Sequence, residues 1–591
     1  MSYLTVICPN YFEKNIIFIL VINGFQFNQQ FLNYILVGSG SGGSVLTNRL
    51  SKNPSINVLL LEAGERPALI SEIPFLHMSA LATKYNWDFP TVPSRRIAHS
   101  IKGRSFNLGA GKVLGGTPML NHNLYVRGNR KDYDNWAKNG AIGWDWRNVF
   151  PYFLKSEDNR NRRIVKNGYH GVDGELIIQY PPFHTPMVRG YLRSAKAIGY
   201  SLGDYNAANQ AVFMPPQGTI NKGRRWSTLH AFINPVVGRR NLEIVTSAYV
   251  TKILIDEHNR AYGVLFDHYN KTFRAIAMRE VIICAGTFNS PKLLMLSGIG
   301  PKEVLNKFRI PVKSDLPVGN NLIDHVSTLG LQFIVDTYTF KETRITKEDF
   351  TDILINGTGP LTSLGGVEVI GFANSKYNKD LDWPDLEIFW VSRSVSSDSV
   401  LREMSGAVEE LEKIFEKYSY LDTITCIPNP TRVKSKGVVT LQSTDPYEYP
   451  LIDLNYFSHT DDLKVSVEGL KVCLQMASSK PMKKLGVRPL PYVIPGCEKY
   501  ELFSDNYLGC MLIAFPLPAH HFAGTCKMGH PKDPTTVVDP TLKVKGVQNL
   551  RVVDASIIPI MIGGHTNIPT IMIAEKAADF ILDDYFSSRN K

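Results

Sequence analysis

A glycine-rich turn between two apolar runs is the feature that most constrains how this chain folds. The chain carries, in order, an apolar run at 34–37, the turn Gly38-Ser-Gly40-Ser-Gly-Gly43, a helical stretch at 44–52, and an apolar run at 58–61 that ends in Glu62. In such a unit the first glycine permits the tight turn, the second lets backbone N–H groups approach a pyrophosphate, and the third lets the helix pack on the strand. Glu62 stands nineteen residues after Gly43, where a carboxylate accepts hydrogen bonds from a ribose diol. The pattern therefore predicts a βαβ unit that binds the ADP half of a dinucleotide.

The rest of the chain shows no division into separate units. Its 591 residues contain no Ser- or Gly-rich linker, charge block or repeat. An apolar content of 44% with 20% charged residues is typical of a soluble enzyme with a large core. The 65 basic and 54 acidic residues give a net charge of +11, but the basic residues are scattered over the sequence. Scattered charge indicates solvated surface, so we expect no nucleic-acid partner. Because no linker divides the chain, we expect one interwoven globule.

The N-terminal segment 1–29 is predicted to be a signal sequence or an N-terminal extension. Its apolar run at 16–22 has the length of a short secretory core, although Glu13 precedes it and no small-residue cleavage site is evident. The run is too short to cross a bilayer, so we expect no integral membrane span. Glycosylation sequons begin at Asn270 and Asn356, a pattern that also arises by chance. Together these features favour a secreted or extracellular protein.

The seven cysteines contain no C-x-x-C pair, so we expect no metal site. Cys497 and Cys510 bracket a short polar loop at 498–509. In a secreted chain this pair is predicted to form a disulfide.

Four further motifs follow the first one. Gly115 and Gly116 lie among small and apolar residues, which suits a backbone laid flat against a planar ring because any Cβ would collide. A buried strand near 281–283 leads through a tight turn into a helix that we expect Ser290 and Pro291 to open. The remaining two motifs are His520-His-Phe-Ala-Gly-Thr525 and the C-terminal pair of segments 550–556 and 563–576.

With these motifs in this order, the chain resembles the glucose-methanol-choline (GMC) family of FAD-dependent oxidoreductases, and most closely its arthropod glucose dehydrogenase-like branch. The resemblance covers nearly all of 34–581. It implies an α/β, mixed α+β fold in which a Rossmann-like FAD-binding domain (30–150, 235–330 and 535–586) is interleaved with an antiparallel-sheet substrate domain (151–234 and 331–534). It also implies hydride transfer from the CH–OH group of an alcohol or sugar to flavin, which a quinone or another acceptor reoxidises.

The resemblance assigns a set of residues to FAD binding. These are Gly38, Gly40, Gly43, Glu62, Gly115, Gly116, Asn121, Val250, Asp554, Ala555 and Thr570. On sequence alone, Asp554 serves equally well as a cap after a buried strand. Pro569 and the apolar spacing after it indicate an amphipathic helix whose N-terminal dipole favours negative charge on the reduced flavin, with Asn567 and Thr570 as its expected caps.

Three residues near the paired glycines depart from the family pattern or qualify it. Pro118 stands where the family has a small residue, and it removes a backbone donor close to the flavin. Leu120 replaces the histidine that members with covalent flavin carry before the matching Asn121, so we expect noncovalent FAD. His122 is expected to be a packed or solvated histidine.

Two histidines are predicted to be catalytic. Imidazole is the side chain best suited to act as a neutral base near pH 7. By the family's H-x-x-G-T pattern, His521 rather than His520 is the base, because it stands three residues before Gly524. His565, five residues before Thr570, matches the partner that orients the substrate hydroxyl. Successive histidines on an extended chain face opposite ways, which disfavours a metal site here.

The sequence leaves three alternatives open. The first is an alcohol or sugar oxidase that uses dioxygen. The second is a non-redox lyase on the same fold, and the third is a member that keeps flavin for structure alone. A nicotinamide dehydrogenase is disfavoured because it would not need the paired glycines or the C-terminal motifs. Substrate-determining residues are expected within about 337–435, where loops carry specificity.

Overall fold

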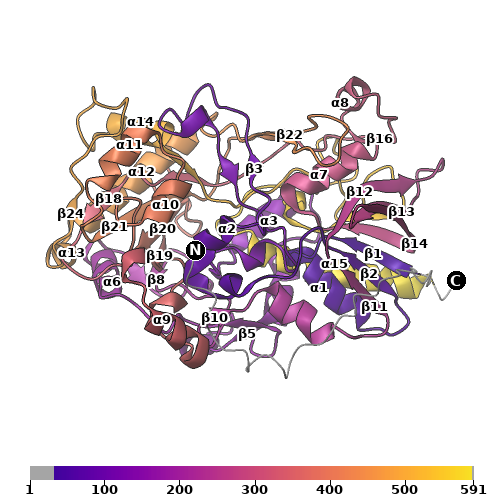
Figure 1. Ribbon diagram of the computed structural model, residues 1–591, viewed down its shortest axis with the longest axis horizontal. Coiled ribbons are helices and arrows are strands. Elements are labelled where there is room, and N and C mark those ends of the chain that lie inside the picture. The colour runs from indigo at the N-terminus through magenta and orange to yellow at the C-terminus, as the bar shows by residue number, and fades with distance from the viewer. Residues whose placement is uncertain (1–31, 589–591) are drawn as a thin grey trace.

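The computed structural model describes residues 32–588, so the predicted signal or extension at 1–29 lies outside the described residues. Two seven-stranded sheets lie beside each other along the long axis of the molecule (Figure 1). Within 32–588 no helix is both long and apolar enough to cross a bilayer. We call the first sheet with its helices the cofactor half and the second sheet with its helices the substrate half, after the roles that the sequence resemblance implies for them.

The first sheet is parallel at its centre. Its order is β11 (Leu242–Val245), β2 (Val58–Leu61), β1 (Leu32–Val37), β14 (Lys271–Ile283), β13 (Ala261–His268) and β12 (Ala248–Ile255), with β26 (Leu550–Val552) also paired to β14. Strands β11, β2, β1, β14 and β26 run parallel, and β14, β13 and β12 form an antiparallel meander. The predicted strands at 34–37 and 58–61 are confirmed. They are almost wholly buried, as expected for strands covered on both faces.

Helix α1 (Ser41–Ser51) packs on β1, β2 and the long C-terminal helix α15 (Asn567–Ser587). It begins three residues before the predicted start at 44, because Gly42 and Gly43 belong to its first turn. A Cβ on Gly43 would lie 1.9 Å from the carbonyl oxygen of Gly38, so the third glycine brings helix and turn together as predicted.

Helix α7 (Gly286–Leu296) corrects one prediction. Ser290 and Pro291 do not open it but lie inside it, since it already begins at Gly286. Pro291 lacks the N–H that would bond the carbonyl of Thr287, and the hydroxyl of Thr525 donates to that carbonyl instead (2.6 Å). Ser290 uses its hydroxyl to bond Asp554.

The second sheet is the predicted antiparallel one, apart from one parallel pair at its edge. Its order is β24 (Arg488–Pro489), β18 (Gln332–Ile334), β21 (Thr423–Pro430), β20 (Leu386–Val391), β19 (Val367–Ala373), β8 (Val212–Met214) and β7 (Ser201–Leu202). All neighbours are antiparallel except β7 and β8. Helix α12 (Thr460–Ala477) covers β20 and β21, and α14 (Asp505–Ala514) packs on α12 (Figure 1).

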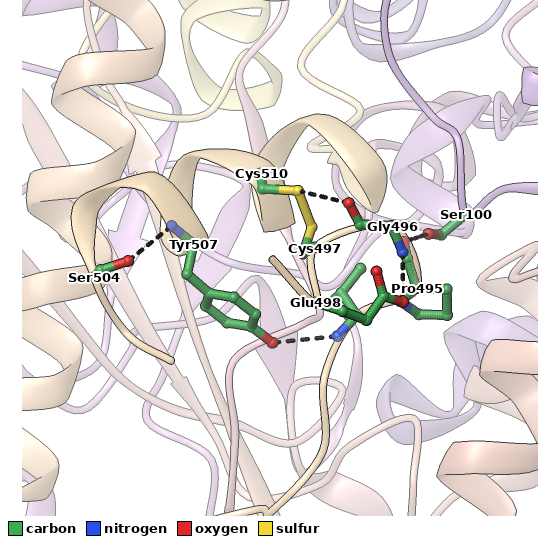
Figure 2. The surroundings of a disulfide bond; sticks show 9 residues. Ser100, Pro495, Gly496, Cys497, Glu498, Ser504, Tyr507 and Cys510 are labelled. Carbon is green, nitrogen blue, oxygen red and sulfur yellow. Dashed lines mark hydrogen bonds between the residues drawn. A yellow bond between two sulfur atoms is a disulfide. The ribbon is translucent and has the colours of Figure 1, made fainter. Parts of the chain in front are cut away.

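Two disulfides fasten the substrate half. The predicted Cys497–Cys510 bond is present, with its Cα atoms 5.8 Å apart. Figure 2 shows it joining the loop at Gly496 to α14, whose first turn is capped by Ser504. A second bond, Cys426–Cys473, links β21 to α12 with a Cα separation of 6.0 Å. The sequence did not reveal this bond because its cysteines are 47 residues apart and lie within regular elements.

Candidate active site

One large cavity lies between the two sheets. Its volume is about 1320 Å³, above the roughly 300–1,000 Å³ usual for a single-ligand pocket. Residues from the glycine motifs line one side, and residues of β19, β20 and β21 line the other. The cavity therefore has room for a cofactor and a substrate together.

The first glycine turn has the open space and the unpaired backbone donors that a pyrophosphate cradle requires. Gly38 has a φ of +98°, and a Cβ there would lie 2.5 Å from the carbonyl oxygen of Cys284. A Cβ on Gly40 would meet nothing within 4 Å, because Gly40 faces the cavity. Gly40 is also the N-cap of α1, which has no side-chain cap, so the N–H groups of the first turn are available to an anion.

Glu62 lies at the end of β2 and lines the cavity, as predicted for a ribose-binding acid. Its carboxylate already accepts hydrogen bonds from the N–H (2.9 Å) and hydroxyl (2.6 Å) of Ser39 and from the N–H of Gly64 (2.8 Å). The same hydroxyl of Ser39 accepts from the N–H of Gly115 (3.0 Å). Glu62 thus also joins the first glycine turn to the second.

The second glycine motif fits against the first. Gly116 has a φ of +63°, and a Cβ there would lie 2.5 Å from the Cα of Gly40. Pro118 lies in the first turn of a 3₁₀ helix (Thr117–Met119), where a backbone donor is not needed. The buried guanidinium of Arg225 donates to the carbonyl of Pro118 (2.9 Å) and to Oδ1 of Asn121 (3.1 Å). Arg225 thus fixes the backbone at Pro118, where the chain departs from the family pattern.

Asp554 caps a short helix and also lies at the cavity. It lines the cavity, and its carboxylate accepts from the N–H of Gly286 (2.9 Å), the hydroxyl of Ser290 (2.6 Å) and the N–H of Ser556 (2.8 Å). The bond to Ser556 caps the short helix Ala555–Ile557. Ala555 also lines the cavity.

The N-terminus of α15 points to the cavity without a side-chain cap, which corrects the prediction that Asn567 and Thr570 cap it. Oδ1 of Asn567 accepts instead from the hydroxyl of Ser41 (2.7 Å), at the start of α1. The hydroxyl of Thr570 donates back to the carbonyl of Thr566 (2.7 Å). The positive ends of two helices are therefore linked at one site. Val250 lines the same cavity from β12.

The structure brings His521 and His565 together at the cavity. Their rings are stacked, with centroids 4.5 Å apart and planes 24° apart. His520 has a φ of +61° and also lines the cavity, but its ring makes a T-shaped contact with Phe522 and is not part of this stack. The predicted partners are therefore neighbours, and His520 is not part of their stack.

Comparison with known proteins gives this site its context. The profile of the GMC oxidoreductase family matches 32–327 with its N-terminal part and 433–574 with its C-terminal part. The chain belongs to the GMC oxidoreductase family.

Its relatives in this family match along most of their length. The chain is 36% identical to glucose dehydrogenase [FAD, quinone] of Drosophila melanogaster, over 92% of this chain and 86% of that one. It is 34% identical to mitochondrial choline dehydrogenase of Homo sapiens, over 93% and 89%. Among solved structures, pyridoxine 4-oxidase from Mesorbium loti is similar, with a TM-score of 0.79, 25% identity, and coverage of 93% and 98%. The protein is an FAD-dependent oxidoreductase that acts on CH–OH donors, and the cradle described above fits FAD.

A third histidine, which the sequence did not single out, determines where His521 carries its hydrogen. Nδ1 of His325 lies 2.9 Å from Nδ1 of His521, and Nε2 of His325 lies 3.1 Å from the carbonyl oxygen of Thr431. A carbonyl only accepts, so neutral His325 carries its hydrogen on Nε2 and accepts at Nδ1. His521 then donates from Nδ1, and its lone pair lies on Nε2. No local pattern around His325 marks it, because its partners come from distant segments.

Glu387 fixes the other imidazole of this GMC oxidoreductase. Its Oε1 accepts from Nε2 of His565 (3.0 Å), and its side chain is fully buried. Nδ1 of His565 is therefore the nitrogen left for a ligand. Glu387 lies on β20, which is 178 residues from His565 in sequence, so no spacing rule predicts the pair.

The imidazoles of His521, His325 and His122 are held neutral. Burial, together with the neighbouring imidazoles, keeps the pKa of His521 well below its ordinary value. Burial also lowers the pKa of His325, and it lowers that of His122 to about 3. His122 faces the cavity and packs on the ring of His77 at 3.8 Å, which agrees with the expected packed role. A neutral His521 is what a general base requires.

Proposed function

We propose that His521 is the base that takes the hydroxyl proton of the substrate, at Nε2, and that His565 orients the hydroxyl. One observation carries this proposal: His521 is stacked on His565 and hydrogen-bonded to His325, so its tautomer and its plane are both fixed. When bound, FAD supplies the hydride acceptor for the carbinol carbon.

Each imidazole has a distinct task in this proposal. His325 accepts the Nδ1 hydrogen of His521 and keeps the Nε2 lone pair free for the substrate proton. Glu387 accepts the Nε2 hydrogen of His565, so Nδ1 of His565 can only accept. It orients the substrate by sharing the single hydroxyl hydrogen with Nε2 of His521 before His521 takes the proton. Once His521 is protonated, His325 beside it stays neutral, because burial lowers its pKa and adjacent imidazolium ions in a buried site repel each other.

We further propose that a quinone or a similar carrier, rather than dioxygen, reoxidises the enzyme. Support comes from the similarity to glucose dehydrogenase [FAD, quinone], which extends over 92% of this chain. The similarity to pyridoxine 4-oxidase makes dioxygen the alternative to be tested.

We also propose that the protein matures in an oxidising compartment and is secreted. Two disulfides in the substrate half support this proposal, because disulfides persist mainly in exported proteins. Asn270 and Asn356, which begin the two sequons, are both exposed and therefore accessible to glycosylation.

The test is anaerobic reduction of the purified yellow enzyme by alcohols with protium or deuterium on the carbinol carbon. A slower bleaching of the flavin with deuterium is expected, because the C–H bond breaks in that step. The reduced enzyme is then mixed with a quinone or with dioxygen. An enzyme that dithionite bleaches but no alcohol or sugar bleaches would refute the oxidoreductase mechanism. Faster reoxidation by dioxygen than by any quinone would make the enzyme an oxidase.

A further inference from the structure

The substrate side of the cavity is walled by alternate residues of two neighbouring strands. In the register of β20 and β21, Phe389 is opposite Ile427, and Val391 is opposite Thr425. All four residues line the cavity. Asn429, the next cavity residue along β21, is opposite Glu387, the residue that holds His565. The histidines thus mark one end of this wall, and the rest of the wall extends away from them.

Beyond the histidine end the wall is apolar. Phe389 is stacked on the ring of His565 at 5.6 Å, with the planes 17° apart. The other apolar residues that line this part of the cavity are Val367, Val391, Ile427, Phe515 and Leu517. A ligand whose reacting carbon lies at His521 and His565 therefore places its remaining atoms against hydrocarbon.

The side chains of Phe389, Val391 and Ile427 carry no polar atoms, so the polar atoms near this space come from a few neighbouring residues. The hydroxyl of Thr425 donates to the carbonyl of Arg393 (3.0 Å), and the guanidinium of Arg393 is paired with Asp398 (2.5 Å). Nε of Arg393 and both ring nitrogens of His77, which also line the cavity, are buried without a hydrogen-bond partner among the described residues. Oδ1 of Asn429 and Oε2 of Glu387 are buried and have no hydrogen-bond partner among the described residues. These two acceptors lie at the histidine end. His122 adds one neutral imidazole at the cavity surface.

We propose that the substrate is an alcohol with an apolar body, aromatic, terpenoid or steroid in kind, whose polar groups are confined to the carbinol end. This inference rests on the proposed function, since it takes the histidine pair as the reacting end. A sugar carries a hydroxyl on nearly every carbon, and the wall of Phe389, Ile427 and Val391 offers these hydroxyls no partner. Burying a sugar hydroxyl without a hydrogen-bond partner costs its desolvation free energy, which offsets most of the binding free energy gained elsewhere. An apolar body instead gains from leaving water.

The test compares substrates on the intact holoenzyme. Anaerobic flavin reduction is measured with cinnamyl alcohol, farnesol, a sterol and glucose. We expect kcat/KM for the best apolar alcohol to exceed that for glucose by about 100-fold or more, since one apolar group in a pocket changes specificity by about 10- to 200-fold. A kcat/KM for glucose equal to or above that of every apolar alcohol overturns the inference and leaves CH–OH oxidation intact. Reduction by none of the four, although dithionite bleaches the flavin, overturns the proposed function instead.

A variant sharpens the comparison. Ile427→Asn places an amide in the apolar wall, and it is expected to raise KM for the apolar alcohols by about 10-fold or more. The matched control is Ile355→Asn, because Ile355 is 77% exposed and remote from the cavity lining. Flavin content is measured in both variants. An unchanged KM in Ile427→Asn with full flavin content contradicts the proposal, and the substrate panel on the parent enzyme decides the matter if this variant does not fold.

Discussion

The cofactor half and the substrate half of this molecule form the cavity by different means, the first mainly with backbone and the second mainly with side chains. The cofactor half uses backbone: positive φ at Gly38 and Gly116, a close approach at Gly43, and helix N-termini without side-chain caps. The substrate half uses side chains on alternate positions of paired strands, and both disulfides lie there. The free cysteines of the described chain, Cys284 and Cys526, are buried and unbridged. Backbone sites leave a mark in local sequence, whereas side-chain walls come together only through strand pairing.

The largest expected effect is at the boundary between the halves. His521→Ala should slow flavin reduction by about 10²- to 10⁴-fold, the usual contribution of one positioned base, while FAD stays bound. Stopped-flow absorbance under anaerobic conditions measures the rate. His520→Ala is the matched neighbour, and its loss should be much smaller because His520 is outside the stacked pair. If His520→Ala proves the slower variant, the base is assigned to the wrong residue.

The next largest effect is on folding stability, and it comes from opening a disulfide in the substrate half without changing flavin binding in the cofactor half. The double change Cys497→Ser and Cys510→Ser should lower the free energy of unfolding by about 3 kcal/mol, as expected for opening a loop of this size. Urea unfolding, followed by tyrosine and tryptophan fluorescence, measures the change. Flavin content of the folded protein should be unaffected, because the bond lies in the substrate half. The parent treated with reductant should lose at least as much stability, since Cys426–Cys473 opens as well; a smaller loss would contradict this account.

A third prediction tests the cradle of the cofactor half. Gly40→Ala is expected to leave the fold intact, because Gly40 has an ordinary φ of −66° and its Cβ would meet no protein atom within 4 Å. The methyl group would instead occupy cofactor space, and we expect FAD affinity to fall by roughly 5- to 150-fold, the size of a modest packing clash. Titration of the apoprotein with FAD measures it. Gly203→Ala, where the new Cβ makes an ordinary 3.5 Å contact with Val212, is the control. Equal FAD affinity in both variants would place the pyrophosphate elsewhere.

A fourth prediction concerns the tautomer of the base. His325→Leu removes the acceptor of the Nδ1 hydrogen of His521, and reduction should slow by on the order of 10-fold, the lower end of the loss when metal-bound histidines lose an orienting partner. His325→Gln keeps an acceptor oxygen and should recover part of the rate. The pH profile of kcat/KM should shift in the leucine variant, which a purely structural role would not cause. Parent-like rates and profiles in both variants would remove His325 from the mechanism.

The smallest expected effect is that of pH on kcat/KM. A lowered pKa keeps His521 neutral below the ordinary histidine value of about 6.5. Since only the neutral imidazole accepts a proton, kcat/KM should hardly change as the pH falls from 7.5 to 6.5, and it should decline only at lower pH. Stopped-flow reduction across this range measures it. A rate already halved at pH 6.5 would indicate a base with an ordinary pKa.

Several sequence predictions depended on local chemistry, and the structure agrees with them for that reason. The strands around Gly38, the packing role of Gly43 and the Cys497–Cys510 bond are set by residues close together in the chain. Caps were predicted less well. Ser290 and Thr570 are of residue types that often cap helices. The hydroxyl of Ser290 instead donates to Asp554, and Thr570 lies one turn inside α15, where its hydroxyl donates to the carbonyl of Thr566.

By itself, the sequence predicted the dinucleotide cradle, because that follows from a short motif whose geometry is local, and its resemblance to the GMC family implied FAD and the candidate pair His521 and His565. Only the tertiary structure decided the rest of the site. It brought His325, Glu387 and Arg225 to the motifs from distant segments, and it opposed Phe389 with Ile427 across two strands. The physical reason is that strand register and buried hydrogen bonds are fixed by packing over the whole core, and no local spacing encodes them.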